Sequence, residues 1–93
     1  MINGNLTEFM DKLYLGEELL FEYAGIDYFL QGWSESGMNI MVLDRLTQPT
    51  VEGYIWQCSC ATMRECAEKF LNEPLWGNDK FLNVHNDVIW KEF

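Results

Sequence analysis

Apolar residues near the start of the chain recur at spacings of three and four, which puts them on one face of an amphipathic helix. The residues on that face are Leu6, Phe9, Met10, Leu13 and Tyr14. Asn5 precedes them as a candidate N-cap, and Glu8 stands three positions later, as in a capping box. Gly16 is expected to end the helix, because glycine is common at helix C-termini. The pattern predicts a helix between Asn5 and Gly16.

Alternation with a period of two residues begins after this helix. Leu19, Phe21 and Tyr23 alternate with their neighbours, which is typical of a half-buried strand. Ala24-Gly25 fits a tight turn, because glycine adopts positive φ without strain. The aromatic-rich segment Asp27–Trp33 is then expected to be the returning strand.

Two more strands are expected after this hairpin. Ser34–Gly37 reads as a second turn, and Met38–Leu43 as a third strand whose apolar run indicates a central, two-sided position. Residues Thr47–Gly53, which include Pro49, form the longest loop, and Tyr54–Cys58 a fourth strand. Short connections favour antiparallel neighbours, so these strands are predicted to form a meander.

The segment Thr62–Glu65 carries the clearest local signature, a capping box at the start of a second helix. Its apolar face is predicted to consist of Met63, Cys66, Ala67, Phe70 and Leu71. Pro74 ends this helix, because proline forces the residue before it out of the helical region.

The C-terminal segment combines two patterns. Phe81–His85 fits one helical turn capped by Asn78 or Asp79, and alternation over Val88–Phe93 favours a final strand. The element order is therefore α-β-β-β-β-α-β in a single domain, residues 1–93. We predict a two-layer α+β fold in which an antiparallel sheet of four to five strands carries two amphipathic helices on one face.

Charge narrows the classes of function. Fifteen Asp and Glu residues oppose six Lys and Arg, a net charge of −9. Nucleic acids and anionic membranes are bound by basic residues, so we expect neither as a partner. A protein partner of basic character, or a stand-alone acidic protein, remains.

Three features indicate a cytoplasmic protein. The longest apolar run, Ile40–Leu43, has four residues, whereas a transmembrane helix needs about 20. The opening residues Met1–Asn5 show neither the basic flank nor the apolar stretch of a secretory signal. Three cysteines cannot all pair within the chain, so reduced thiols are expected.

Aromatic residues make up 15% of the chain, more than one helix-covered face is expected to bury. The remaining rings would form an apolar patch on the other face of the sheet, and such patches usually mark association. The residues expected there are Tyr28, Trp33, Tyr54, Trp56 and Trp90. The alternative is that the C-terminal segment folds over this face and buries them all.

The thiols suggest a second kind of site. Cys58 and Cys60 are two residues apart, so on a strand they point to the same side, and Cys66 and His85 could complete a Cys₃His zinc site. Structural zinc sites more often use two cysteines separated by two residues, and the apolar pattern explains the three cysteines as core residues. A nucleophilic Cys66–His85 dyad is a further possibility, against which His85 is simply a surface histidine. Neither a metal nor another cofactor is predicted.

Four segments carry a resemblance: Tyr23–Trp33, Ile55-Trp56, Glu65–Leu71 and Pro74–Trp90. Together they resemble a family of short acidic proteins of Gram-positive bacteria to which no activity is assigned. The resemblance covers most of the chain. It implies a small bacterial cytosolic protein of one domain, and it implies no mechanism.

These observations favour a non-catalytic protein-interaction module over an enzyme. We expect it to act through an aromatic sheet face rimmed by carboxylates. The face would bind a second copy in a homodimer, or a basic protein such as a nuclease toxin in an immunity-like role. The alternative is a small enzyme or a metal or ligand binder that uses Cys58, Cys60, Cys66 and His85.

Overall fold

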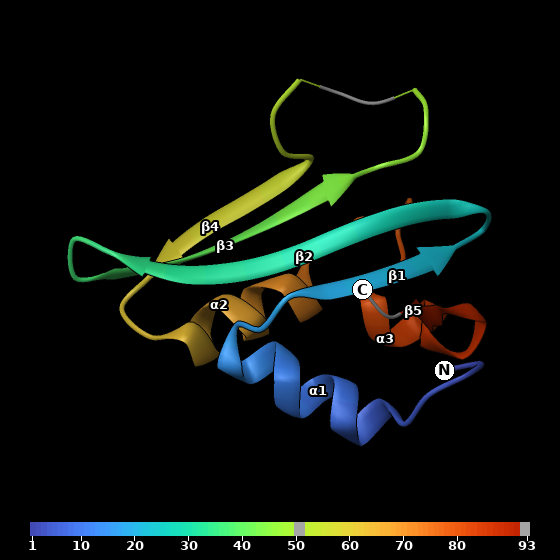
Figure 1. The fold of residues 1–93 in the computed structure, drawn as a ribbon, viewed down its shortest axis with the longest axis horizontal. Coiled ribbons are helices and arrows are strands. Elements are labelled where there is room, and N and C mark those ends of the chain that lie inside the picture. Colours follow the sequence, from blue (N-terminus) through green and yellow to red (C-terminus); the bar gives the residue numbers. More distant parts are fainter. Residues whose placement is uncertain (50–51, 92–93) are drawn as a thin grey trace.

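Residues 1–49 and 52–91 are described by a computed structural model, and they form an α+β fold. The elements are α1 (Leu6–Leu15), β1 (Leu19–Tyr23), β2 (Ile26–Glu35), β3 (Met38–Arg45), β4 (Trp56–Cys60), α2 (Met63–Asn72), α3 (Phe81–Val84), the 3-10 turn η1 (His85–Asp87) and β5 (Ile89–Lys91). The strands form one antiparallel sheet in the order β4-β3-β2-β1-β5. The three helices all lie on one face of it (Figure 1). The predicted two-layer arrangement is confirmed, with α3 as a third helix.

Both long helices begin at the residues that their caps predict. The Asn5 side chain accepts hydrogen bonds from the backbone N–H groups of Thr7 and Glu8, at 2.8 and 3.3 Å. Thr62 accepts from the N–H of Glu65 at 3.2 Å, which is the N-cap half of the predicted capping box. The Thr62 hydroxyl also donates to the Glu65 carboxylate at 3.3 Å, so the two side chains are bonded directly to each other.

The end of α1 approaches the middle of β2 at two glycines. Gly16 closes the helix in the left-handed conformation, with φ at 73°, and its carbonyl accepts a hydrogen bond from the N–H of Gly32 at 3.1 Å. Met63 fills the space beside them: a Cβ placed on Gly16 would lie 2.7 Å from its methyl group, and one placed on Gly32 would lie 2.8 Å from it. The first turn of α2 therefore packs closely on this junction, where Met63 would have to shift for a side chain at either position, and only Gly16 also has a positive φ.

Gly16→Ala is expected to lower the free energy of unfolding by about 2–3 kcal/mol, because a positive φ costs about 1–2 kcal/mol and overpacking against Met63 adds to it. Gly37 is the matched control, since its φ is also positive, at 81°, while no atom lies within 4 Å of its added Cβ. Gly37→Ala should cost about 1 kcal/mol in the same urea titration. An equal cost for both variants would mean that Met63 moves aside freely.

The hairpins differ from the expected boundaries by a few residues. The first turn, Ala24-Gly25, is as predicted, and both residues have positive φ. The second turn is reduced to Ser36-Gly37, because β2 and β3 stay paired to Glu35 and Met38. A two-residue turn of this kind matches the twist of the strands, so pairing continues to the end of the hairpin.

The fourth strand begins and ends two residues later than the sequence predicts. β4 covers Trp56–Cys60 and not Tyr54–Cys58, since it pairs with Asn39–Leu43 of β3. Of the predicted loop Thr47–Gly53, residues 50 and 51 lie outside the described part of the chain. So do residues 92 and 93 of the predicted final strand.

The short C-terminal elements close the other end of the sheet. α3 starts after Lys80, whose N–H donates to the Asn83 side chain at 2.8 Å, and not after the predicted caps Asn78 or Asp79. β5 then pairs with β1. Asn3 secures this edge strand by accepting from the Trp90 N–H and donating to its carbonyl, both at 2.6 Å.

Aromatic rings make up the centre of the core between sheet and helices. Phe21 of β1 lies in the middle, with ring centroids 5.4–6.2 Å from those of four other rings. Those rings belong to Phe9, Tyr28, Trp76 and Phe81. Phe9, Phe21 and Phe81 are fully buried, so the helices cover this face completely at its centre.

Candidate functional site

Three of the five aromatic residues expected on the uncovered face lie on the other one. Tyr28 is 5% exposed and stacks on Phe21 in the core. Trp56 packs against Phe70 of α2, and Trp90 against Phe9 of α1. The prediction that Tyr28, Trp56 and Trp90 lie on the uncovered face is wrong, because the alternation along each strand directs them towards the helices.

Trp33 alone of that group lies on a strand and points away from the helices. It is five residues from Tyr28 on β2, and an odd spacing places two strand residues on opposite faces. Tyr54 comes two residues before β4 and is 43% exposed. The structure therefore does not gather the five predicted residues into one surface.

Other apolar residues join Trp33 on that face. We call it the open face: the side of the sheet opposite the three helices, marked by the apolar residues Leu20, Phe29, Trp33, Ile40 and Val42. Leu20 is paired across strands with Phe29, and Trp33 with Ile40. No described helix lies over this face, whereas neighbouring side chains leave each of these residues half-buried or, at Val42, 1% exposed.

Trp33 was predicted on the uncovered face, but Leu20, Phe29, Ile40 and Val42 were not, because no single one of them differs from an ordinary core residue in the sequence. The one signal was the apolar run Ile40–Leu43, which predicted a strand with apolar residues on both faces. β3 is indeed an interior strand between β2 and β4. Its residues Met41 and Leu43 face the helices, while Ile40 and Val42 alternate with them on the open face.

Charged residues surround the apolar stripe. The ammonium group of Lys91 lies 2.7 Å from the Asp27 carboxylate and 3.0 Å from that of Glu22, and both neighbours raise its pKa, Asp27 more than Glu22. Glu35 accepts a hydrogen bond from the Trp33 indole at 3.4 Å. Asp44 lies beside Phe29 in the pairing of β2 with β3. Around the apolar stripe, the carboxylates of these residues therefore outnumber the ammonium group of Lys91.

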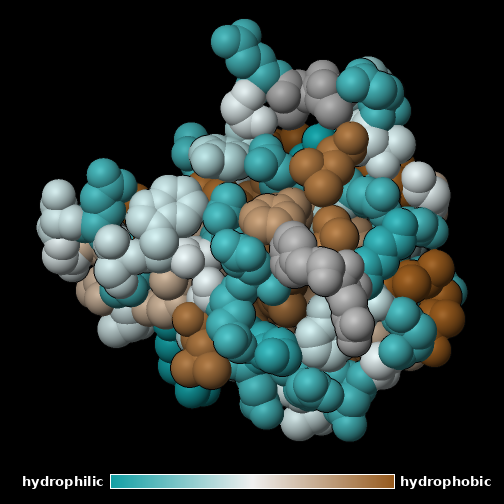
Figure 2. Space-filling view, viewed as in Figure 1, coloured by the Kyte–Doolittle hydropathy of each residue, from teal (hydrophilic) through white to brown (hydrophobic). Residues whose placement is uncertain are grey.

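Apolar groups also lie on the side of the molecule that Figure 2 shows. In the view of Figure 2 they appear as several patches divided by hydrophilic atoms.

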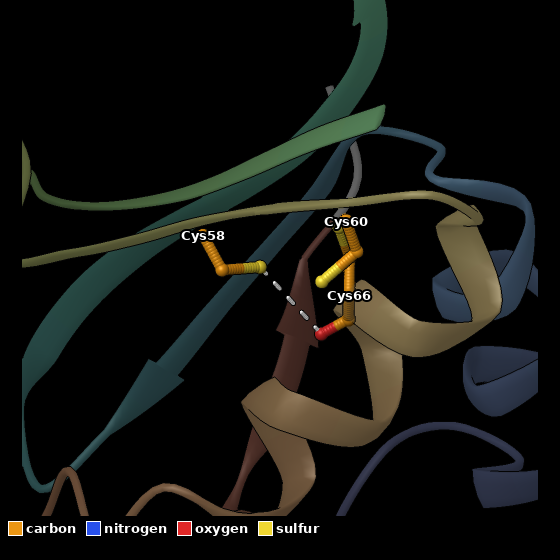
Figure 3. A group of neighbouring side chains, drawn as sticks. All are labelled: Cys58, Cys60 and Cys66. Atoms are coloured by element: carbon orange, nitrogen blue, oxygen red, sulfur yellow. Dashed lines mark hydrogen bonds between the residues drawn. The ribbon is translucent and has the colours of Figure 1, made fainter. Parts of the chain in front are cut away.

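Three cysteines come together where β4 meets α2. Cys58 and Cys60 lie on the same side of β4, as predicted, and Cys66 faces them from the first turns of α2 (Figure 3). Their three sulfur atoms all lie within 4.8 Å of one another. The Cys58 thiol points at the carbonyl of Cys66, 4.0 Å away, and the Cys66 thiol donates to the Asn39 carbonyl at 3.3 Å. We call these three residues the cysteine cluster.

The cluster is almost closed to solvent. Cys60 and Cys66 are 4% and 0% exposed, and Cys58 is half-buried. Burial, followed by the neighbouring Cys66, raises the pKa of the Cys58 thiol to about 12, and burial also raises the pKa of Cys66. Lys69, one turn along α2, has its pKa raised chiefly by a hydrogen bond to the Cys60 side chain. That contact was not foreseen, since nothing in the sequence aligns Lys69 with β4.

His85 is not part of the cluster. Its Nδ1 lies 3.5 Å from the N-terminal amine, at the start of η1. Among the described residues, the group that could hold a metal consists of Cys58, Cys60 and Cys66 alone. The structure therefore assembles neither the Cys₃His site nor the Cys66–His85 dyad.

A surface groove between the start of α1 and β5 is a third feature. Asn3, Glu8, Lys12 and Trp90 are among the residues that line it. Acidic, basic and apolar side chains are mixed along it, so it indicates no single class of ligand.

Comparisons with other proteins add no relationship. No protein-family model, curated protein or solved structure matches the chain significantly. Within the described ranges, no helix combines the length and apolar character that crossing a bilayer would require.

Proposed function

We propose that this protein is a non-catalytic interaction module whose open face binds a basic protein. The observation that carries the proposal is the apolar stripe on the face opposite the helices, in which Leu20, Phe29, Trp33 and Ile40 are half-buried and Val42 lies beneath the surface. Large apolar residues on one surface, surrounded by charged ones, are typical of a protein-binding site. Trp33 is its natural anchor, because tryptophan is enriched among residues that dominate binding energy.

Charge favours a basic partner over a second copy of the chain. The strand residues of the open face include Glu22, Asp27, Glu35 and Asp44 but one cation, Lys91. Two chains of net charge −9 would bring like charges together, whereas a basic surface would be attracted and its association accelerated. A nuclease toxin is one partner of this chemistry, which would make the protein immunity-like.

The thiols give little support to the enzyme alternative. A nucleophilic cysteine needs a lowered pKa or an adjacent base, and the pKa values of Cys58 and Cys66 are raised instead. His85, the one histidine of the sequence, lies by the N-terminal amine and not by the cluster.

Trp33→Ala is expected to weaken partner binding at least about 30-fold, the effect of removing an anchor worth about 2 kcal/mol. Wild type and variant, each immobilised, are exposed to an extract of the cells that make the protein, and the retained proteins are identified by mass spectrometry. Leu82→Ala is the matched control, because Leu82 is 46% exposed but lies on α3, on the helical side.

The expected result is a protein with a net positive charge that wild type and Leu82→Ala retain, that Trp33→Ala loses, and that salt releases. The affinity of that protein, once purified, is then measured for all three chains. Equal retention by all three would contradict the proposal. A dimer in sedimentation that Trp33→Ala dissociates would replace the basic partner with a second copy.

A further inference from the structure

The cysteine cluster is a ready-made set of three sulfur ligands, independent of the open face. β4 supplies two thiols from one side of the strand, and α2 supplies the third from the facing helix (Figure 3). The N-cap Thr62, which accepts from the Glu65 N–H, marks where α2 begins, two residues after the strand ends. The close approach of the sulfurs therefore follows from two rigid elements and a defined connection.

Only a small movement would bring the sulfurs to a common ion. Three thiolates arranged in a plane around a metal, with metal–sulfur bonds of about 2.3 Å, lie about 4.0 Å from one another. The cluster already holds its sulfurs within 4.8 Å. A contraction of less than about 1 Å, within reach of small side-chain rotations, completes the triangle.

The composition of the cluster selects the metal. Thiolate sulfur is a soft ligand that favours Cu(I) and Zn(II), while harder ions prefer oxygen. Structural zinc is almost always held by four ligands, and no fourth side chain with a suitable atom belongs to the group among the described residues. Cu(I) is satisfied by three sulfurs.

We propose that Cys58, Cys60 and Cys66 form a three-sulfur binding site for Cu(I). Each Cu–S bond replaces an S–H bond, and the proton passes to solvent, so copper remains Cu(I) and no electron is transferred. The bound group is anionic, because three thiolates outweigh the single positive charge of Cu(I). Burial of Cys60 and Cys66 shields the ion from water and oxidants, and half-buried Cys58 is the most exposed of the three ligands.

The test uses Cu(I) itself, added anaerobically as its acetonitrile complex to the reduced, metal-free protein. We expect one copper per chain, a near-ultraviolet thiolate-to-copper absorption band, and an X-ray absorption spectrum with three sulfurs and no nitrogen. Because the site exists in the folded chain, copper should also raise the melting temperature. Binding of zinc in preference to copper, or a melting temperature lowered by copper, would overturn the proposal.

Substitutions separate the cluster from general thiol binding. Cys58→Ala and Cys66→Ala should each weaken Cu(I) binding more than about 100-fold against a competing chelator, a larger loss than from a residue that only hydrogen-bonds to a metal ligand. Ser59→Ala is the control, since Ser59 lies between Cys58 and Cys60 on β4, is exposed and pairs with Ile40 of the open face. Cys58 is half-buried, so its alanine variant should fold, as its circular dichroism will show. Unchanged affinity in that folded variant would refute the site.

Discussion

Phe21→Ala should lower the free energy of unfolding by about 3–5 kcal/mol, the usual cost of deleting a buried phenylalanine ring. Phe21 is fully buried and lies in ring contact with Phe9, Tyr28, Trp76 and Phe81. These rings come from four separate segments of the chain, so the cavity left by Phe21 cannot be closed by one side chain. A domain of 93 residues is stable by about 5–14 kcal/mol, so the loss takes a large part of the total.

Urea denaturation followed by tryptophan fluorescence measures this loss. Trp33→Ala is the contrasting variant, because Trp33 is a large aromatic on the same sheet that no described helix covers. Trp33→Ala should lower the free energy of unfolding by about 1 kcal/mol or less if the Trp33 ring serves mainly to contact a partner. A cost for Trp33→Ala as large as that for Phe21→Ala would show that the open face is part of the core, and the proposed binding surface would then be lost.

The local elements were predictable because their signals are local. The N-caps Asn5 and Thr62 bond to backbone within three residues, and the Ala24-Gly25 turn depends on two residues. Such contacts are specified by the sequence around them, whatever the rest of the chain does. The sequence therefore predicts correctly where α1 and α2 start and where the first hairpin turns.

The faces of the sheet were harder to predict. Alternation shows which residues share a face but not which face the helices will cover. Tyr28 and Trp33 were grouped as aromatic residues, although five residues separate them on one strand. Only the buried neighbours, such as Leu30 at an even spacing from Tyr28, show that Tyr28 belongs to the core.

Long-range pairing could not be deduced at all. The final strand was expected from its alternation, but nothing in its residues says that it pairs with β1 and not with β4. The two-residue displacement of β4 likewise depends on its partner, since pairing with β3 determines where the strand begins. Both are outcomes of packing the whole domain.

The cysteine cluster combines a part that the sequence predicts with a part that only the fold determines. The shared side of Cys58 and Cys60 follows from a spacing of two, and the inward face of Cys66 follows from helical periodicity. That the three sulfurs meet depends on how α2 lies across β4, which no spacing encodes. The predicted fourth ligand, His85, was included by residue type alone, and the fold places it elsewhere.

Cys58 in the folded, metal-free protein should react with a disulfide reagent about 50-fold more slowly than in the unfolded chain at pH 8. Burial raises its pKa from 9.0 to about 12, so the thiolate fraction falls about 1,000-fold. A thiolate of higher pKa is intrinsically more nucleophilic, and over this range of pKa the rate constant of the thiolate itself rises about 20-fold. The product of the two effects is the expected ratio, and limited access through the half-buried surface can only increase it.

Hydroxyethyl disulfide is a suitable reagent, because it is neutral and is not repelled by the acidic protein. Mass spectrometry of the Cys58 peptide gives the rate in buffer and in urea. In buffer the rate should rise tenfold for each pH unit without levelling near pH 9, since the folded thiol stays protonated up to about pH 12. Equal rates in buffer and urea would mean an accessible thiol of ordinary pKa, and would return the enzyme alternative to consideration.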